Sequence, residues 1–245
     1  MNLRGMLLGS LIGLTSCATN DYNNHNSSYN HNQENNVVDK KQDELQTLVN
    51  KADSYYEDNN WKEASAWYKK AIDFKEDDND ALFHYKRGFA LAMSGEFDEA
   101  LKEYNEGYKE MPHVKLDLFK NKEAGRLYRK GMEIEEKDKE EARKLFKRSM
   151  ELDPRSPLPY NELGNMYLRE GNNEDALEMF NLGGKCDPFS GGSLVSIASA
   201  LKEQKKYKEA KEFYKLSLVI TEQNSMRQLA KNRLTEINKI LEQEK

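Results

Sequence analysis

The sequence predicts an all-α fold, a solenoid of about five helical hairpins closed by a final helix. Only five prolines occur in 245 residues, and 33% of residues are charged against 37% apolar, a balance typical of many amphipathic surfaces around a thin core. Runs of Glu, Lys, Leu and Ala favour helix because their side chains lose little rotamer freedom there. A spacing of small and aromatic residues also recurs along the chain, as expected for stacked repeats.

The first element is an export signal, predicted over residues 1–16. Arg4 precedes an apolar run from Met6 to Leu14 that is too short to span a membrane. Small residues follow the run. This order of basic, apolar and small residues indicates a secretory signal that is removed from the mature protein.

Cys17 is the predicted lipid-attachment residue. It closes the sequence Leu-Thr-Ser-Cys, which resembles the lipobox of bacterial lipoproteins. That resemblance implies cleavage before Cys17 and acylation, with chains such as palmitate, so that two or more chains hold the protein stably at a membrane. Conventional cleavage after Ala18 is the alternative, because Ser16 and Ala18 are also small.

Residues 17–42 are predicted to form a tether between the lipid and the folded body. Between residues 20 and 36 the chain is rich in Asn and contains no Leu, Ile or Phe. Such a segment lacks the apolar surface that offsets the entropy lost when a chain becomes ordered. We therefore expect a disordered linker.

A repeated spacing defines the body over residues 43–224. A small residue is followed twelve positions later by an alanine, and an aromatic residue lies four positions beyond that. In the third copy the first interval is eleven, which predicts a shorter turn. The five copies are Ala52/Ala64/Tyr68, Gly88/Ala100/Tyr104, Gly131/Ala142/Phe146, Gly164/Ala176/Phe180 and Ala198/Ala210/Tyr214.

This spacing resembles the tetratricopeptide repeat (TPR). The clearest copy adds Gly171 in the turn and Pro188 after the second helix. The resemblance implies a right-handed array of antiparallel helix pairs that pack closely through the small residues. The expected hairpins cover residues 45–78, 81–114, 123–156, 157–190 and 191–224.

Two parts of the array depart from regularity. About eight extra residues lie between Pro112 and Ala124, and we expect them to lengthen the first helix of the third hairpin, because Val114, Leu118 and Phe119 offer it an apolar face. Residues 225–245 continue as an amphipathic helix. A solenoid leaves an apolar face open at its end, so this helix is the expected cap.

The sequence gives no support for catalysis, a cofactor or a metal site. It contains no phosphate-binding loop, nucleophile elbow or paired metal-ligand motif, so we expect no enzyme. His84 falls at a helix-packing position without an evident partner for general-base work. Cys186 is interpreted as a small packed residue. A net charge of −5 argues against a nucleic-acid partner.

The resemblance places a partner-binding groove on the first helix of each hairpin. In the second hairpin the apolar positions spaced three or four apart form the core of the predicted strip, and neighbouring hairpins extend it. The alternative is that these side chains fill contacts between hairpins or meet the tether. The predicted groove residues are Leu82, Tyr85, Phe89, Met93, Tyr56, Tyr128, Met132, Asn161, Asn165 and Arg169.

The predicted function is that of a membrane-anchored adaptor or scaffold that binds a protein or peptide in this groove. The lipobox resemblance implies a bacterial cell envelope, and the residue after the cysteine, Ala18, is not the aspartate that acts as a retention signal, which favours the outer membrane. Related lipoproteins take part in envelope assembly. A self-associating structural surface protein, and so a homo-oligomer, is the alternative.

Overall fold

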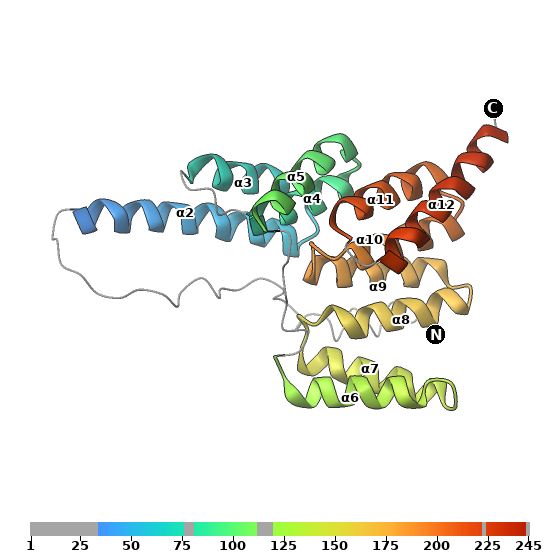
Figure 1. The fold of residues 1–245 in the computed structure, drawn as a ribbon. Coiled ribbons are helices and arrows are strands. Elements are labelled where there is room, and N and C mark those ends of the chain that lie inside the picture. The colour runs from blue at the N-terminus through green and yellow to red at the C-terminus, as the bar shows by residue number, and fades with distance from the viewer. Residues whose placement is uncertain (1–33, 76–80, 112–119, 222–223, 244–245) are drawn as a thin grey trace.

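The computed structural model describes residues 34–75, 81–111, 120–221 and 224–243. Throughout these ranges the regular structure is helical, with no strand, which confirms the all-α prediction. The helices follow one another as antiparallel pairs and a final single helix (Figure 1). They are α2 (Glu34–Glu57), α3 (Trp61–Phe74), α4 (Ala81–Ser94), α5 (Phe97–Glu110), α6 (Lys122–Ile134), α7 (Lys139–Leu152), α8 (Pro157–Arg169), α9 (Asn173–Cys186), α10 (Gly191–Glu203), α11 (Tyr207–Ile220) and α12 (Asn224–Gln243).

The two helices of each pair approach closely where a small residue faces an aromatic ring. A Cβ atom on Gly164 would lie 2.5 Å from the ring of Phe180, so only glycine permits this approach of α8 to α9. The same contact joins Gly131 to Phe146 in the third pair, where the distance would be 2.7 Å. The third repeat therefore keeps this contact despite its shorter interval.

The turn inside four of the hairpins contains one residue with a left-handed backbone. Gly95 and Gly171 adopt φ of 88° and 77°, which glycine does without steric cost. Asn59 and Lys205 take the equivalent places with φ of 57° and 61°. No described residue of the α6–α7 turn has a positive φ, as expected if that turn is one residue shorter.

The third hairpin begins close to its predicted start at residue 123, without the expected lengthening of its first helix. The extra residues do not lengthen its first helix, because α6 starts at Lys122. The side chain of Asn121 accepts hydrogen bonds from the backbone N–H groups of Glu123 and Ala124, which caps the helix there. The carboxylate of Asp153 holds the preceding turn through the backbone N–H groups of Lys120 and Asn121. Residues 112–119 lie outside the described part of the chain.

The first helix begins earlier than predicted. α2 starts at Glu34, inside the segment assigned to the tether, and extends well beyond the paired length of α3. Residues 34–42 include Val37, Val38 and several Asp, Lys and Gln residues, so the Asn-rich composition that argued against order ends before the predicted tether does. Residues 1–33, with the predicted signal and Cys17, lie outside the described residues.

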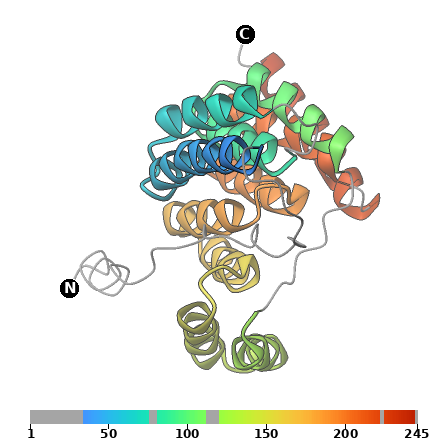
Figure 2. The ribbon, with the colours of Figure 1, turned by 90° about the vertical axis from the view of Figure 1, so that its left-hand side faces the viewer.

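The hairpins do not stack in one continuous series. α3 packs on α4, α7 on α8, α9 on α10 and α11 on α12, whereas α6 does not pack along α5. Instead α5 packs on α11, and α4 approaches α9. Figures 1 and 2 show α6 and α7 at one end of the molecule, with α8 and α9 separating them from α2–α5. The first two hairpins thus return onto the fourth and fifth.

α12 covers the end of the array, which confirms the predicted capping helix. It packs along α11 and also reaches α10. Ala230 and Ile237 on its inner side are fully buried, while Leu229 on its outer side is 38% exposed. Among the helices of the described residues, none combines the length and the apolar character needed to cross a membrane.

Candidate functional site

The apolar strip predicted on α4 is largely covered. Tyr85 and Phe89 are 2% and 0% exposed, and their rings contact the fourth hairpin and its connection to the fifth. The Tyr85 ring lies 5.5 Å from that of Phe189, and the Phe89 ring would lie 2.7 Å from a Cβ on Gly184. The expectation that these two side chains face an open groove is therefore wrong, because the return of the chain places its own residues against them.

The remaining predicted positions near α4 are also partly or fully enclosed. Tyr56 is 1% exposed and packs edge-on against Trp61 and Tyr68. Leu82 and Met93 are half-buried. This surface, formed by Leu82, Tyr85, Phe89 and Met93, is called the α4 face below.

The predicted residues that stay accessible lie on α6 and α8. Met132 is 42% exposed, the Arg169 side chain is 55% exposed, and Tyr128 and Asn165 are half-buried. Side chains from the two helices meet, since Arg169 pairs with Glu135. α10 offers no equivalent surface, because most of its apolar residues are buried against neighbouring helices. We call the six side chains that make up this surface the α6–α8 strip: Tyr128, Met132, Glu135, Glu162, Asn165 and Arg169.

Two carboxylates complete the α6–α8 strip and were not predicted. Glu162 accepts a hydrogen bond from the Asn165 amide at 3.2 Å and another from the Tyr128 hydroxyl. Burial, then Glu162 and Glu135, raise the pKa of Tyr128 to about 12, so this hydroxyl stays protonated as a donor. Glu162 lies three residues before Asn165, a spacing that places both on one helix face and was available in the sequence.

Asn161 does not belong to the strip. Its Oδ1 atom would lie 2.6 Å from a Cβ on Gly183, which places it against α9 of its own hairpin. The sequence spacing of four between Asn161 and Asn165 shows a shared face but not which part of that face meets the partner helix. The Oδ1 atom of Asn161 is therefore directed toward α9, and its role in the groove stays a prediction.

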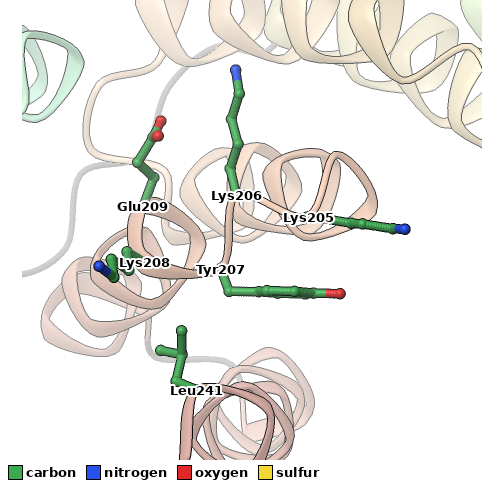
Figure 3. Close-up of a pocket in the computed structure, with 6 residues that line it drawn as sticks. All are labelled: Lys205, Lys206, Tyr207, Lys208, Glu209 and Leu241. Atoms are coloured by element: carbon green, nitrogen blue, oxygen red, sulfur yellow. The ribbon is translucent and has the colours of Figure 1, made fainter. Parts of the chain in front are cut away.

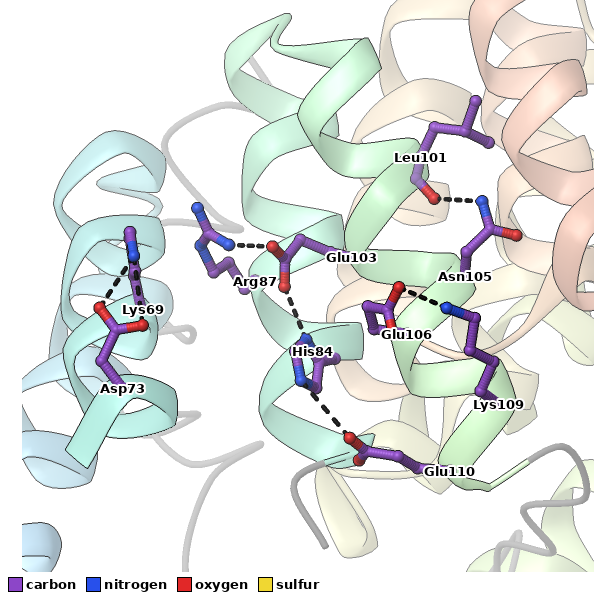
Figure 4. Close-up of polar contacts among 10 residues, drawn as sticks. All are labelled: Lys69, Asp73, His84, Arg87, Leu101, Glu103, Asn105, Glu106, Lys109 and Glu110. Carbon is purple, nitrogen blue, oxygen red and sulfur yellow. Dashed lines mark hydrogen bonds and ion pairs between the residues drawn. The ribbon is translucent and has the colours of Figure 1, made fainter. Parts of the chain in front are cut away.

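His84 takes part in an ion-pair network on α4 and α5. Its Nδ1 lies 2.7 Å from Glu103 and its Nε2 lies 3.6 Å from Glu110, while Arg87 also pairs with Glu103 (Figure 4). Burial opposes ionisation of the Glu103 carboxyl, but His84 and Arg87 together lower its pKa below the usual range. This network joins the two helices of one hairpin, which supports the structural interpretation of His84.

A shallow pocket of about 230 Å³ lies where the α10–α11 turn meets α12. Figure 3 shows its three lysine side chains pointing away from one another, so they do not converge on a common anion. We therefore interpret these lysines as a solvated surface. The lining residues are Lys205, Lys206, Tyr207, Lys208, Glu209 and Leu241.

The described residues contain no group of three or more His, Cys, Asp or Glu side chains arranged to hold a metal ion. Cys186 carries a half-buried thiol whose Sγ lies 3.5 Å from the carbonyl oxygen of Pro154. Its contact is with backbone, consistent with a packed residue.

Comparison with known protein families finds three matches. A model described as TPR repeat matches residues 52–95, and two models described as tetratricopeptide repeat match residues 145–178 and 192–224. The first matched segment contains the copy Ala52/Ala64/Tyr68, and the last contains Ala198/Ala210/Tyr214. The second spans the junction of the third and fourth copies and contains Phe146, Gly164 and Ala176. A search of the curated proteins finds no significant match.

Solved structures with a similar fold are also repeat proteins. The first TPR of Spaghetti (RPAP3), bound to an HSP90 peptide, is 23% identical with a TM-score of 0.46, over 51% of this chain and 98% of that one. PilF of Pseudomonas aeruginosa is 19% identical with a TM-score of 0.41, over 82% and 86%. YrrB, titled a TPR protein with an unusual peptide-binding site, is 16% identical with a TM-score of 0.40, over 82% and 98%. With the helical hairpins seen here, the three family matches show that this chain carries tetratricopeptide repeats.

Proposed function

We propose that this protein is a lipid-anchored scaffold that binds a segment of another protein along the α6–α8 strip, and that it acts in assembly of the bacterial cell envelope. The supporting observation is the contrast between the inner helices. Tyr85 and Phe89 on α4 and most apolar residues of α10 are buried, whereas Met132 on α6 and Arg169 on α8 have exposed side chains.

The chemistry of the α6–α8 strip suits an extended peptide. Asn165 and Arg169 supply N–H donors, and Glu135 and Glu162 supply acceptors, so the main chain of a bound segment finds partners of both kinds. Met132 and the Tyr128 ring add an adaptable apolar contact for one side chain. This mixture binds a partner without any step of bond making, so the proposal is a binding protein and not an enzyme.

Site-specific photo-crosslinking tests the strip. A photoreactive residue replaces Met132 on the strip in one variant and Leu229 on the outer side of α12 in the other, since the two are similarly exposed at 42% and 38%. In the native cells we expect one defined protein to be captured from position 132 and not from position 229. Adding Arg169→Ala should reduce that capture. Circular dichroism of this variant checks that the fold is kept, because the Glu135 side chain is only 13% exposed and loses its ion-pair partner. Equal capture from both positions, or none, would contradict the proposal.

The lipid anchor rests on the sequence around Cys17 alone. The two cysteines of the chain provide a matched pair of variants. In cells fed an alkyne-labelled fatty acid, we expect Cys186→Ser to be labelled like the wild type and Cys17→Ser to be unlabelled and absent from the membrane fraction. Labelling that persists in Cys17→Ser would show that the anchor is misplaced.

A further inference from the structure

The first two hairpins are docked on the rest of the protein as a unit. α2–α5 pack among themselves, and α6 does not pack along α5. Among the described residues, the contacts that hold α2–α5 in place come mainly from α9, α11 and the segment from Lys185 to Phe189, which leads from α9 to α10 and which we call the corner. We call this set of contacts the docking contact. It can open without breaking any hairpin.

Aromatic rings supply the apolar part of the docking contact. The Phe97 ring at the start of α5 meets the Phe213 ring of α11 at a centroid distance of 5.5 Å. The Tyr85 ring of α4 meets the Phe189 ring of the corner, also at 5.5 Å. The free energy of such contacts comes from the removal of apolar surface from water and does not depend on a proton.

The corner also carries two ionisable side chains, Lys185 and Asp187. The Lys185 side chain is only 6% exposed, and its Nζ donates a hydrogen bond of 2.6 Å to the carbonyl oxygen of Glu57. The same Nζ lies 3.1 Å from the Glu57 carboxylate. Lys185 is thus bound at the C-terminal end of α2, where carbonyl groups lack partners within the helix.

The Asp187 carboxyl is enclosed in the docking contact with too few partners. Among the described residues, its Oδ1 atom is buried without a hydrogen-bond partner, and so is the hydroxyl of Tyr104 on α5. Tyr104 is fully buried, and the charge of Asp187 acts on it, so the two groups face each other across the contact. Tyr85 of α4 lies beside Tyr104, with the ring centroids 6.1 Å apart. An ionised carboxyl in this place lacks hydration that opening of the contact would restore.

Burial raises the pKa of the Asp187 carboxyl to about 7, and a hydrogen bond from the Phe189 backbone opposes only part of this effect. Among the described residues, no ionised side chain contributes to the shift. A carboxyl that water reaches has a pKa of about 3.9, so the docked form binds the proton more tightly than an open form. The ratio of open to docked protein should therefore rise roughly tenfold between pH 6 and pH 8 and level off above that range.

We propose that the docking contact is a proton-controlled switch, in which the neutral Asp187 carboxyl keeps α2–α5 on the corner and α11, and loss of its proton releases α2–α5 as one unit. The aromatic rings and the contact of Lys185 with Glu57 favour the docked form at every pH, and Asp187 makes the balance depend on pH. The switch involves contacts between hairpins only, so it does not depend on what the α6–α8 strip binds.

Two spectroscopic probes of urea denaturation test the switch in the full chain. Both tryptophans, Trp61 and Trp67, lie on α3, so tryptophan fluorescence follows the first hairpin, whereas far-UV circular dichroism follows all helices. At pH 5.5 the two transitions should coincide, because the docked protein unfolds as one unit. At pH 8 they should separate, because urea then opens the docking contact before the hairpins unfold.

Matched variants assign the effect to one carboxyl. Asp187→Asn keeps an acceptor for the Phe189 backbone N–H and has no proton to lose, so its two transitions should coincide at both pH values. Asp43→Asn removes the same charge from an exposed position on α2 and should behave like the wild type. If Asp187→Asn does not fold, Asp187→Ser, which also keeps a short uncharged acceptor, takes its place.

Small-angle X-ray scattering distinguishes opening from local unfolding. In urea just below the transition at pH 8, the radius of gyration of the wild type should increase while its helical content is unchanged, and that of Asp187→Asn should not increase. Three results would overturn the proposal: coincident transitions of the wild type at both pH values, a separation at pH 8 that persists in Asp187→Asn, or a separation without an increase in the radius of gyration.

Discussion

The closest approaches between helices depend on single glycines. Gly164 leaves no room for a methyl group beside the fully buried ring of Phe180, whereas Gly192 on α10 has ordinary space around it, with the nearest atoms at 3.5 Å and 3.8 Å. Both glycines lie in helices, and neither has a positive φ. The two positions therefore separate the steric role of glycine from its low helix propensity.

We expect Gly164→Ala to lower the free energy of unfolding by about 1–3 kcal/mol, because the ring of Phe180 must move within a packed core. Gly192→Ala should be neutral or stabilising by up to about 1 kcal/mol, since alanine is the better helix former. Urea denaturation of both variants measures the difference. Equal effects at the two positions would mean that α8 and α9 do not approach as closely as described.

Asp187 makes the corner sensitive to pH. Burial raises the pKa of its carboxyl to about 7, and a hydrogen bond from the Phe189 backbone only partly opposes this. The folded protein thus binds this proton more tightly than the unfolded chain, where aspartate has a pKa of about 3.9. The stabilising contribution is complete below that value and is lost as pH rises through about 7.

Asp187→Asn should therefore remove part of the decline in unfolding free energy between pH 6 and pH 8, measured by urea denaturation. Tyr104 on α5 faces Asp187, and Tyr85 on α4 lies beside Tyr104. The two tyrosines are uncharged in this pH range. A decline that is unchanged in Asp187→Asn would assign the whole effect to another group.

At the scale of single elements, α6 and α12 end the array in different ways. α6 starts the third hairpin after a break, and it carries exposed charged residues such as Arg126, Arg129 and Glu133. α12 covers α11 with an apolar side and leaves a polar side in water. The charged residues of α6 and the packing of α12 both keep apolar surface from being exposed at the open faces of a repeat array.

The capping role of α12 predicts unequal effects along one helix. Ile237→Ala should destabilise the protein by about 2–4 kcal/mol, because Ile237 is fully buried against the array. Leu229→Ala on the outer side should change stability by no more than about 0.5 kcal/mol. Thermal unfolding of the two variants gives the comparison. A small effect of Ile237→Ala would show that α12 is not docked.

At the scale of the whole molecule, the helical hairpins were predictable from the sequence. The packing of the first two hairpins on the fourth and fifth was not. Spacings such as Gly164 to Phe180 are local, so the sequence alone indicates the helix pairs and even the shortened third turn. The contact of Tyr85 with Phe189 joins residues that are far apart in the chain. It depends on how the first two hairpins are oriented relative to the later ones, and the repeat spacing does not encode that orientation.

The same limit explains the division of the predicted binding residues. Their positions on the first helices follow from helical periodicity. Whether such a face remains open depends on the tertiary arrangement, which buries Phe89 and leaves Met132 exposed. A regular array would have left both accessible.

The closure of α2–α5 onto α9–α11 is the central structural claim, and Phe97 and Phe213 test it most directly. Their rings meet edge to face at 5.5 Å, one from the start of α5 and one from α11. A double-mutant cycle with Phe97→Ala and Phe213→Ala should give a coupling energy of about 0.5–1.5 kcal/mol in urea denaturation. Effects that add within about 0.3 kcal/mol would contradict the closure and restore an open α4 face.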